Sequence, residues 1–137
     1  MSTFEQCRDE IVALINTALG VSHPTLDVFY ENTLTVDLDT VGDRFVRIEL
    51  EFDDAAQLTI NNTPADRTYG TVYFTIFLKE GLGTRPHLEL AQFFKDLVAF
   101  KTATHYRFEV VRPGKRGAKD GWRSYEVCAP FWFDAGI

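Results

Sequence analysis

Apolar residues recur every three or four positions in two stretches of the chain, which is the pattern of an amphipathic helix. The first stretch predicts a helix of about 16 residues near the start of the chain. Ser2 and Glu5 have the spacing of a capping box that begins such a helix, and Gly20 is expected to end it. The second stretch predicts a helix from about residue 84 or 85 to residue 100, with Pro86 in its first turn.

Elsewhere apolar and polar residues alternate, as they do in half-buried β-strands. The expected strands are a short extended piece at 28–30, then 44–52, 56–61, 71–78, 105–111 and 122–133. Asp53 and Asp54 are expected to form the turn of a hairpin between the second and third of these segments. Residues 61–70 have the composition of a loop. Residues 71–78 are apolar on both faces, which is typical of a central strand.

The order of these elements predicts an α+β fold in a single domain spanning residues 1–137. We expect a mixed, mostly antiparallel sheet of about five strands, with the two helices packed on one face. Residues 112–121 carry three glycines and four basic side chains, and they are predicted to form a flexible basic loop. The basic residues of this loop are Arg112, Lys115, Arg116 and Lys119.

Composition adds an uneven distribution of charge to this picture. The formal net charge of -6 argues against bulk nucleic-acid binding. Nine acidic residues stand against two arginines over residues 27–54, a local sum of -7, whereas six basic residues stand against two acidic ones over 107–123, a local sum of +4. Aromatic residues make up 14% of the chain, so either the core is rich in phenylalanine or some aromatic rings face a partner.

The glycine turn at residues 81–83 is the one feature shaped like a ligand cradle. It lacks the lysine and hydroxyl pattern of a Walker loop and the third small residue of a dinucleotide fingerprint. Pro86 removes one amide donor and Glu80 places a negative charge beside the turn. We therefore expect a corner between strand and helix, in which glycine permits positive φ.

Other candidate chemistry is equally sparse in the sequence. The three histidines lack metal-ligand spacing, and His87 is expected at the surface. Cys128, His105 and Glu126 could form a nucleophilic triad only if the fold brought them together. No catalytic, cofactor-binding or metal residue is assigned, so an enzyme is not expected and no cofactor is expected. A hydrolytic or ligand-binding domain centred on the glycine turn stays an alternative that would need a deep polar pocket.

The cellular setting is inferred from what the sequence lacks. No apolar run approaches the roughly 20 residues that span a bilayer, and the N-terminus does not have the layout of a signal peptide. We expect a soluble protein made in a cytoplasm, without a membrane partner. Its two cysteines form no motif and are expected to be reduced and partly buried.

Nearly the whole chain resembles the tail terminator proteins of long-tailed phages, the lambda-type family that completes the tail tube. The resemblance runs through the segments FVRIELEF, RTYG, VYFTIFL, GLG, ELAQFFKDLVAF and WRSYEVCAPFWF, in that order, and the N-terminal helix and FYENT are similar to the family's opening. The sequence departs from the family pattern at Lys79 and Glu80, before the glycine turn.

The resemblance implies a structural virion protein that forms a homohexameric ring on the last ring of the tail tube. Such a ring ends polymerisation of the major tail tube protein and presents a surface to the head-completion or connector protein. It would act at the head-proximal end of the virion tail, after assembly in the host cytoplasm. DNA would pass through its lumen without specific binding.

The charged segments suggest which residues make these contacts. In a ring built head to tail, the basic segment of one subunit would meet the acidic segment of the next. The candidate interface residues are Asp37, Asp39, Asp43, Arg112, Lys115, Arg116, Lys119, Trp122 and Trp132. The main alternative is a small nucleic-acid-binding module that uses the basic loop 112–121 to contact phosphates.

Overall fold

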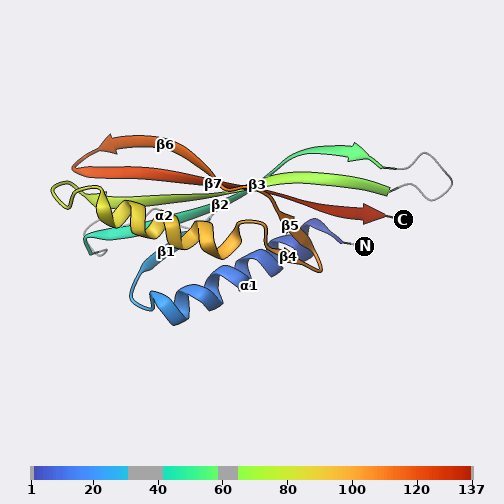
Figure 1. The fold of residues 1–137 in the computed structure, drawn as a ribbon, viewed down its shortest axis with the longest axis horizontal. Helices are drawn as coiled ribbons and strands as arrows, with labels where there is room; N and C mark the ends of the chain where they lie inside the picture. Colours follow the sequence, from blue (N-terminus) through green and yellow to red (C-terminus); the bar gives the residue numbers. More distant parts are fainter. Residues whose placement is uncertain (1, 31–41, 59–64, 137) are drawn as a thin grey trace.

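The computed structural model describes residues 2–30, 42–58 and 65–136, and Figure 1 labels their helices and strands. In chain order they are α1 (Phe4–Ser22), β1 (Asp27–Tyr30), β2 (Arg44–Gln57), β3 (Ala65–Lys79), α2 (Arg85–Val98), β4 (Thr102–Ala103), β5 (Tyr106–Phe108), β6 (Arg112–Lys119) and β7 (Trp122–Gly136). The sheet has the order β1-β2-β3-β7-β5-β4, and β6 pairs with β7 off this path.

Within the described residues, β1 and β2 run parallel and every other strand pairing is antiparallel. The predicted α+β class, with a mixed and mostly antiparallel sheet, is therefore confirmed. The sheet has 7 strands, more than the roughly five expected, because β4 was not predicted and β6 was expected as a loop.

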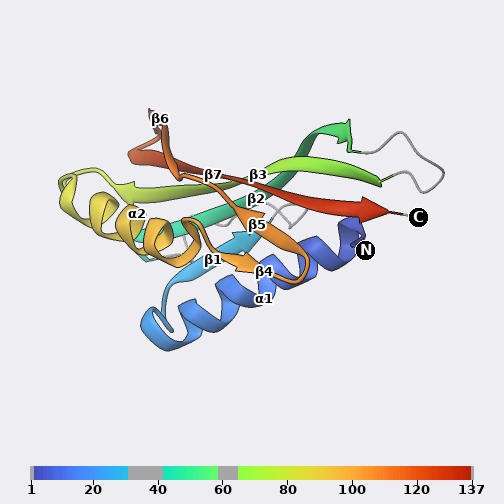
Figure 2. The same cartoon turned by 45° about the vertical axis from the view of Figure 1, so that its right-hand side comes forward.

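Both helices lie on one face of the curled sheet, as predicted (Figures 1 and 2). Residues at a spacing of four on α1 turn toward the sheet and are buried: Cys7, Ile11, Ile15 and Leu19. On α2 the ring of Phe94 stacks on Phe74 of β3, with ring centroids 4.5 Å apart. The inward side chains of β2, β3 and β7 complete this core.

A second, smaller apolar cluster lies on the opposite face of the sheet. Phe45 and Trp122 are buried there, and Phe29 and Phe77 pack against them. Because side chains alternate across a strand, β3 contributes Phe77 to this cluster and Ile76 to the main core. The prediction of a central strand with two apolar faces is confirmed, since β3 pairs with β2 on one side and β7 on the other.

The predicted boundaries of α1 are each displaced by one or two residues. Thr3, not Ser2, is the N-cap, and its capping box is closed by Gln6 and not by Glu5. Ser2 instead places its hydroxyl 2.9 Å from Nδ1 of His105. The helix also runs past Gly20 to Ser22, because a single glycine costs only about 1 kcal/mol inside a helix.

The predicted hairpin turn at Asp53 and Asp54 is wrong. β2 continues through these residues with a bulge between Phe52 and Asp54, and its partner is β3. β3 begins at Ala65, so the second half of the expected loop at 61–70 is a strand. Part of the expected strand at 56–61 lies outside the described residues.

The prediction of a loop at 112–121 is also wrong. Its residues form β6, which pairs antiparallel with β7. Asp120 and Gly121 connect the two strands with φ angles of 53° and 82°, as the central residues of a type I′ hairpin turn require. The Asp-Gly pair at 120–121 is the sequence signal for this hairpin, and it lies at the end of the segment predicted as a loop.

Candidate assembly surfaces

The four basic residues of β6 are solvent-exposed: Arg112, Lys115, Arg116 and Lys119. Among the described residues, no ion pair joins any of these four side chains to a carboxylate. The guanidinium of Arg116 instead lies 5.2 Å from the ring centroid of Tyr125 on β7. β6 therefore carries four exposed basic side chains that make no ion pair within the described part of the subunit.

A groove runs between α2 and the β6–β7 hairpin. It consists of two cavities of about 270 and 260 Å³ that share Leu88 and Tyr125 as lining residues. We call this feature the α2–β6 groove. Its other lining residues are Thr84, His87, Ala91, Gln92, Lys95, Val111, Arg112, Pro113, Arg116, Gly117, Ala118, Arg123, Ser124 and Val127.

The α2–β6 groove has an apolar floor and a basic rim. Leu88 is 49% exposed at the groove, although leucine is usually buried. Lys95 on α2 and the two arginines of β6, Arg112 and Arg116, flank this floor from opposite sides. None of the described lining residues is an aspartate or a glutamate, so the groove suits an apolar group that carries negative charge beside it.

His87 is a lining residue of the groove, but it is buried and is not the surface residue that the sequence predicted. It is 5% exposed, and its Nε2 lies 3.1 Å from the carbonyl oxygen of Arg123 on β7. Burial lowers the pKa of His87 below its ordinary value. A neutral imidazole therefore joins the first turn of α2 to the sheet.

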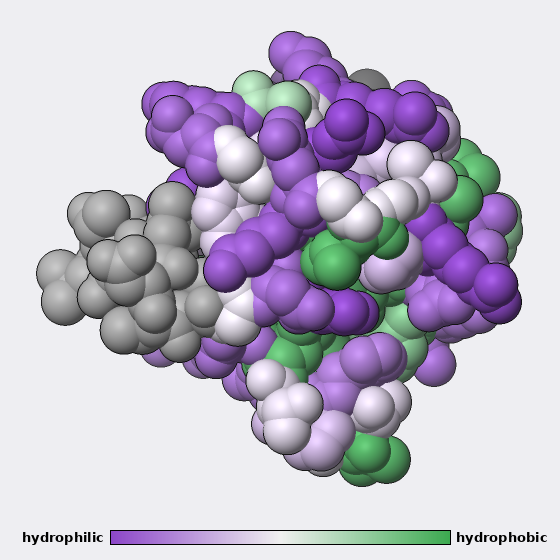
Figure 3. Space-filling model, turned by 90° about the vertical axis from the view of Figure 1, so that its left-hand side faces the viewer, coloured by the Kyte–Doolittle hydropathy of each residue, from purple (hydrophilic) through white to green (hydrophobic). Residues whose placement is uncertain are grey.

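Figure 3 faces the end of the molecule at which β3 passes into α2. Hydrophilic residues dominate this end, with hydrophobic residues gathered near its centre. The glycine turn lies here, and Gly81 and Gly83 have φ angles of 95° and 76°. The expectation of a corner with positive φ is confirmed, and Thr84 begins α2 without a side-chain cap.

A contrasting surface lies along the far part of β2. Phe4 of α1 is 57% exposed and Phe52 of β2 is 37% exposed, and their rings meet edge to face with centroids 4.7 Å apart. Glu5, Glu51 and Asp54 are exposed beside these rings. We call these five residues the β2 edge patch.

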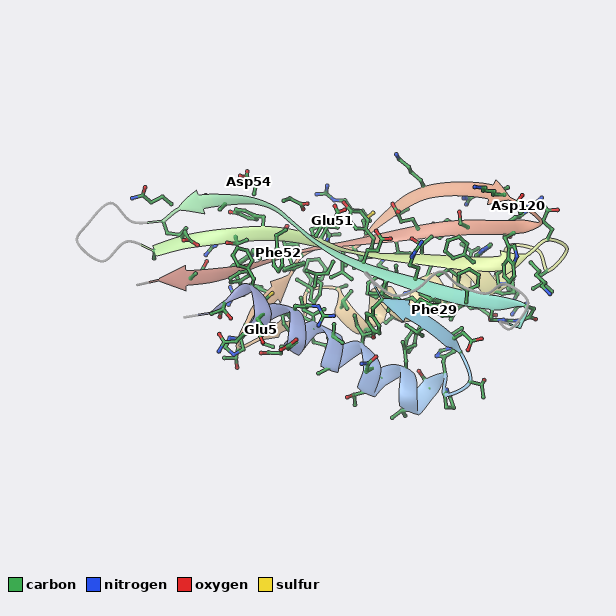
Figure 4. The ribbon with its side chains drawn as sticks, turned by 180° about the vertical axis from the view of Figure 1, so that it is seen from behind. Glu5, Phe29, Glu51, Phe52, Asp54 and Asp120 are labelled. Atoms are coloured by element: carbon green, nitrogen blue, oxygen red, sulfur yellow. The ribbon has the colours of Figure 1, made fainter. Side chains whose placement is uncertain are left out.

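The carboxylates of this patch lie on both sides of its aromatic centre. Figure 4 shows Phe52 between the sheet and α1, Glu5 on α1, and Asp54 on the opposite side of the sheet. The bulge at residues 52–54 produces this arrangement, because it changes the alternation of side chains along β2. The patch thus has aromatic rings with acids on both sides, and the groove has an apolar floor with bases on both sides. The two surfaces are complementary in charge.

The two surfaces are built on different elements of the subunit. In the sheet, β3 and β7 lie between β2, which carries part of the patch, and β6, which carries one side of the groove (Figures 1 and 2). Among the described residues, no ion pair joins an acid of the patch to a base of the groove.

The other residues proposed as interface residues have different surroundings. Asp37 and Asp39 lie outside the described residues. Asp43 is exposed and pairs with Arg44 at 3.1 Å, and the hydrogen bond from Arg44 lowers the pKa of Asp43. Trp122 is 8% exposed within the cluster around Phe45 and stabilises the subunit itself, so it offers little surface to a partner.

Trp132 is half-buried, and two arginines make cation–π contacts with its ring. The guanidinium carbons of Arg67 and Arg107 lie 3.6 and 4.9 Å from the ring centroid. Arg67 also donates two hydrogen bonds to Asp134, at 2.8 and 3.2 Å. Trp132 therefore lies in a polar cavity of about 370 Å³ near the N-terminal end of α1.

Ser2, His105 and Glu10 form a constellation in this region that the sequence did not reveal. Ser2 Oγ lies 2.9 Å from Nδ1 of His105, and Glu10 Oε2 lies 3.8 Å from Nε2. The second distance is too long for a hydrogen bond, and Ser2 is 7% exposed. The contact links the start of α1 to the turn between β4 and β5.

The triad considered from the sequence does not assemble around Cys128. His105 contacts Ser2 and Glu10, whereas Cys128 donates a hydrogen bond to Glu126 at 3.5 Å. Burial, assisted by Glu126, raises the pKa of Cys128 to about 11, and burial raises that of Cys7 to about 12. Both cysteines are free thiols, as predicted, and neither has the lowered pKa of a nucleophile.

The described residues contain neither a metal-binding cluster nor a membrane-spanning helix. In residues 2–30, 42–58 and 65–136, no cluster of three or more His, Cys, Asp or Glu side chains is placed to hold a metal ion. Over the same residues, no helix combines the length and the apolar character needed to cross a membrane.

Comparison with known proteins identifies the fold without identifying a function. No family model and no curated protein matches the chain. Solved structures do match it, and one of them has a TM-score of 0.64, covers 92% of this chain and 94% of its own, and is 14% identical. The name of that protein states neither an activity nor a partner, so the likeness shows a shared fold alone.

Proposed function

We propose that this protein is a structural assembly subunit that forms a ring, and that it acts as a tail terminator of a long-tailed phage. The observation that carries the proposal is the position of its two complementary surfaces. The basic α2–β6 groove and the acidic β2 edge patch are separate surfaces of one subunit, with β3 and β7 between β2 and β6 in the sheet. Contact between unlike surfaces is heterologous, and it closes into a ring when the rotation between subunits permits.

The phage assignment within this proposal rests on the sequence resemblance that runs from FVRIELEF to WRSYEVCAPFWF. A terminator needs no chemistry, because its task is performed by shape. One surface of the ring must bind the last ring of the tail tube, and the other must bind the head-completion protein. The tube stops growing because the free face of this ring binds the head-completion protein and not another ring of tube protein.

The experiment that tests this function uses the purified full chain with the tail-tube protein encoded near it. Sedimentation and negative-stain microscopy are expected to show rings, and these rings are expected to stop tube growth from one end. Tubes of unchanged length, with no ring at their ends, would reject the terminator function. A chain that stays monomeric at high concentration would reject ring formation itself.

A second function, nucleic-acid binding, is favoured by the four solvent-exposed basic side chains of β6. Four phosphate contacts would make the logarithm of the binding constant fall with the logarithm of salt concentration, with a slope of roughly -3.6 for duplex DNA. Fluorescence anisotropy on a labelled duplex between low and physiological salt measures this slope. Absence of binding at low salt would remove this alternative.

A further inference from the structure

We infer that the β2 edge patch of one subunit docks in the α2–β6 groove of a second copy of the chain. The inference rests on the proposed ring and names the surfaces that build it. It assigns Phe4 and Phe52 as the anchors and the groove beside Leu88 as their receptor.

The apolar parts of the two surfaces fit in size and character. Each cavity of the groove has a volume of about 260 to 270 Å³. A cavity of roughly 150 Å³ is enough to bind benzene, so either cavity can accept one phenyl ring. Phe4 and Phe52 are exposed and already packed edge to face, so they present a preformed aromatic pair. Aromatic residues that fill a pocket commonly supply most of the free energy of an interface.

The charges of the two surfaces are complementary on both sides of these rings. On the patch, Glu5 lies on the α1 side of the rings, and Glu51 and Asp54 are exposed along β2. On the groove, Lys95 lies on α2, and Arg112 and Arg116 lie on β6. Glu5 can therefore face one side of the basic rim, and Glu51 and Asp54 the other side, when the rings enter the groove. Such pairing sets orientation and rejects wrong partners.

A second copy is the occupant that the geometry favours. The chain carries both halves of the complementary pair, and within one subunit β3 and β7 separate β2 from β6. Every subunit in a closed ring then has one occupied groove and one occupied patch. This arrangement neutralises the positive charge of β6, which is unpaired among the described residues of the subunit.

The test uses charge reversal on each surface, in the full-length chain. The groove variant carries Arg112→Glu and Arg116→Glu, and the patch variant carries Glu51→Lys and Asp54→Lys. The matched control carries Lys115→Glu and Lys119→Glu, which make the same charge change on β6 at residues that do not line the groove. Circular dichroism and thermal unfolding check that each variant is folded.

Sedimentation velocity is expected to show assembly weakened at least about tenfold in the groove variant and in the patch variant, but not in the control. An equimolar mixture of the two defective variants is expected to assemble again. The reversed groove of one variant fits the reversed patch of the other, and their two unaltered surfaces also fit. An interface between two identical surfaces gives no such rescue.

The outcomes separate this inference from the proposed function. If both variants assemble and stop tube growth as the wild type does, the docking is wrong and the terminator function stands. If the variants behave as expected but wild-type rings do not stop tube growth, the docking stands and the terminator function is wrong. An equal defect in the control, or a mixture that does not reassemble, overturns the docking. A monomeric wild type overturns both.

Discussion

At the scale of single residues, close packing in the sheet leaves no room for a side chain at Gly70. A Cβ atom on Gly70 of β3 would lie 2.5 Å from the carbonyl oxygen of Glu51 and 2.5 Å from Cζ of Phe131. The Phe131 ring is 1% exposed and is fixed within the core. Gly70 therefore allows the ring of a neighbouring strand to lie against the backbone of β3, and β2 to lie close on the other side.

Replacing Gly70 with alanine is expected to lower the free energy of unfolding by about 1 to 3 kcal/mol, because the core is overpacked. Urea unfolding at equilibrium measures this change. Gly20→Ala is the matched control, since Gly20 lies in α1 and a Cβ there meets nothing within 4 Å. This control is expected to stabilise the protein by about 0.5 to 1 kcal/mol. Equal effects of the two substitutions would contradict the packing argument.

His87 makes the stability of the subunit depend on pH. Its pKa in the folded protein is lowered by burial, so the unfolded chain binds a proton more readily. Stability is therefore lost as pH falls below the unfolded value of about 6.5 toward the lower folded pKa. Above about pH 7 the imidazole is neutral in both states and contributes no pH dependence.

The variant His87→Gln removes the titrating group. Urea unfolding at pH 7.5 and pH 5 is expected to show a smaller loss of stability in the variant than in the wild type. The reason is that glutamine has no proton to gain on unfolding. A loss as large in the variant as in the wild type would show that other groups cause the acid sensitivity.

At the scale of elements, the β6–β7 hairpin positions the basic side chains of the groove. β6 has a partner strand on one side only, and it contains Pro113, as edge strands often do. Its turn depends on Gly121, whose φ of 82° is costly for residues with a side chain. A short turn thereby determines where Arg112 and Arg116 lie relative to α2.

Gly121→Ala is expected to destabilise the hairpin by about 1 kcal/mol, since a Cβ there is free of contacts and only the backbone conformation is costly. In the alanine variant, hydrogen exchange at the β6 amides is expected to be faster than in the wild type, whereas exchange at the β3 amides is expected to change little. Gly121→Asn is the control, because asparagine tolerates positive φ, and its effect is expected to be smaller. Unchanged exchange in the alanine variant would show that β6 is held by contacts other than its turn.

At the scale of the whole molecule, the subunit carries opposite charges on two separate surfaces. The groove carries Lys95, Arg112 and Arg116, and the patch carries Glu5, Glu51 and Asp54. Attraction between such surfaces is long-ranged at low salt and is screened within about 10 Å at 0.1 M ionic strength. The aromatic anchors are insensitive to this screening.

Assembly is accordingly expected to weaken, but not to disappear, when the sodium chloride concentration is raised from about 0.05 M to about 0.5 M. The defect caused by reversing Arg112 and Arg116 is expected to be larger at low salt than at high salt, because repulsion between exposed charges is screened. Sedimentation velocity across this series measures both effects. A defect that is the same at all salt concentrations would mean that these arginines act through packing and not through charge.

The sequence predicted the elements in which local signals agreed with the tertiary environment. The central strand at 71–78, the corner with Gly81 and Gly83, and α2 are present as expected. It failed where a local signal was overridden by pairing with another strand. Asp53 and Asp54 have the composition of a turn, yet they lie in β2 because β3 pairs along the whole length of that strand.

The sequence by itself determined the α+β class, the corner before α2 and the presence of separate acidic and basic segments. These properties follow from periodicity, glycine conformation and residue counts, which are local. Only the tertiary structure decided that β6 borders a groove, that Phe4 meets Phe52, and that Trp122 and His87 are buried. Each of these depends on contacts between residues far apart in the chain, and no pattern within one segment encodes them.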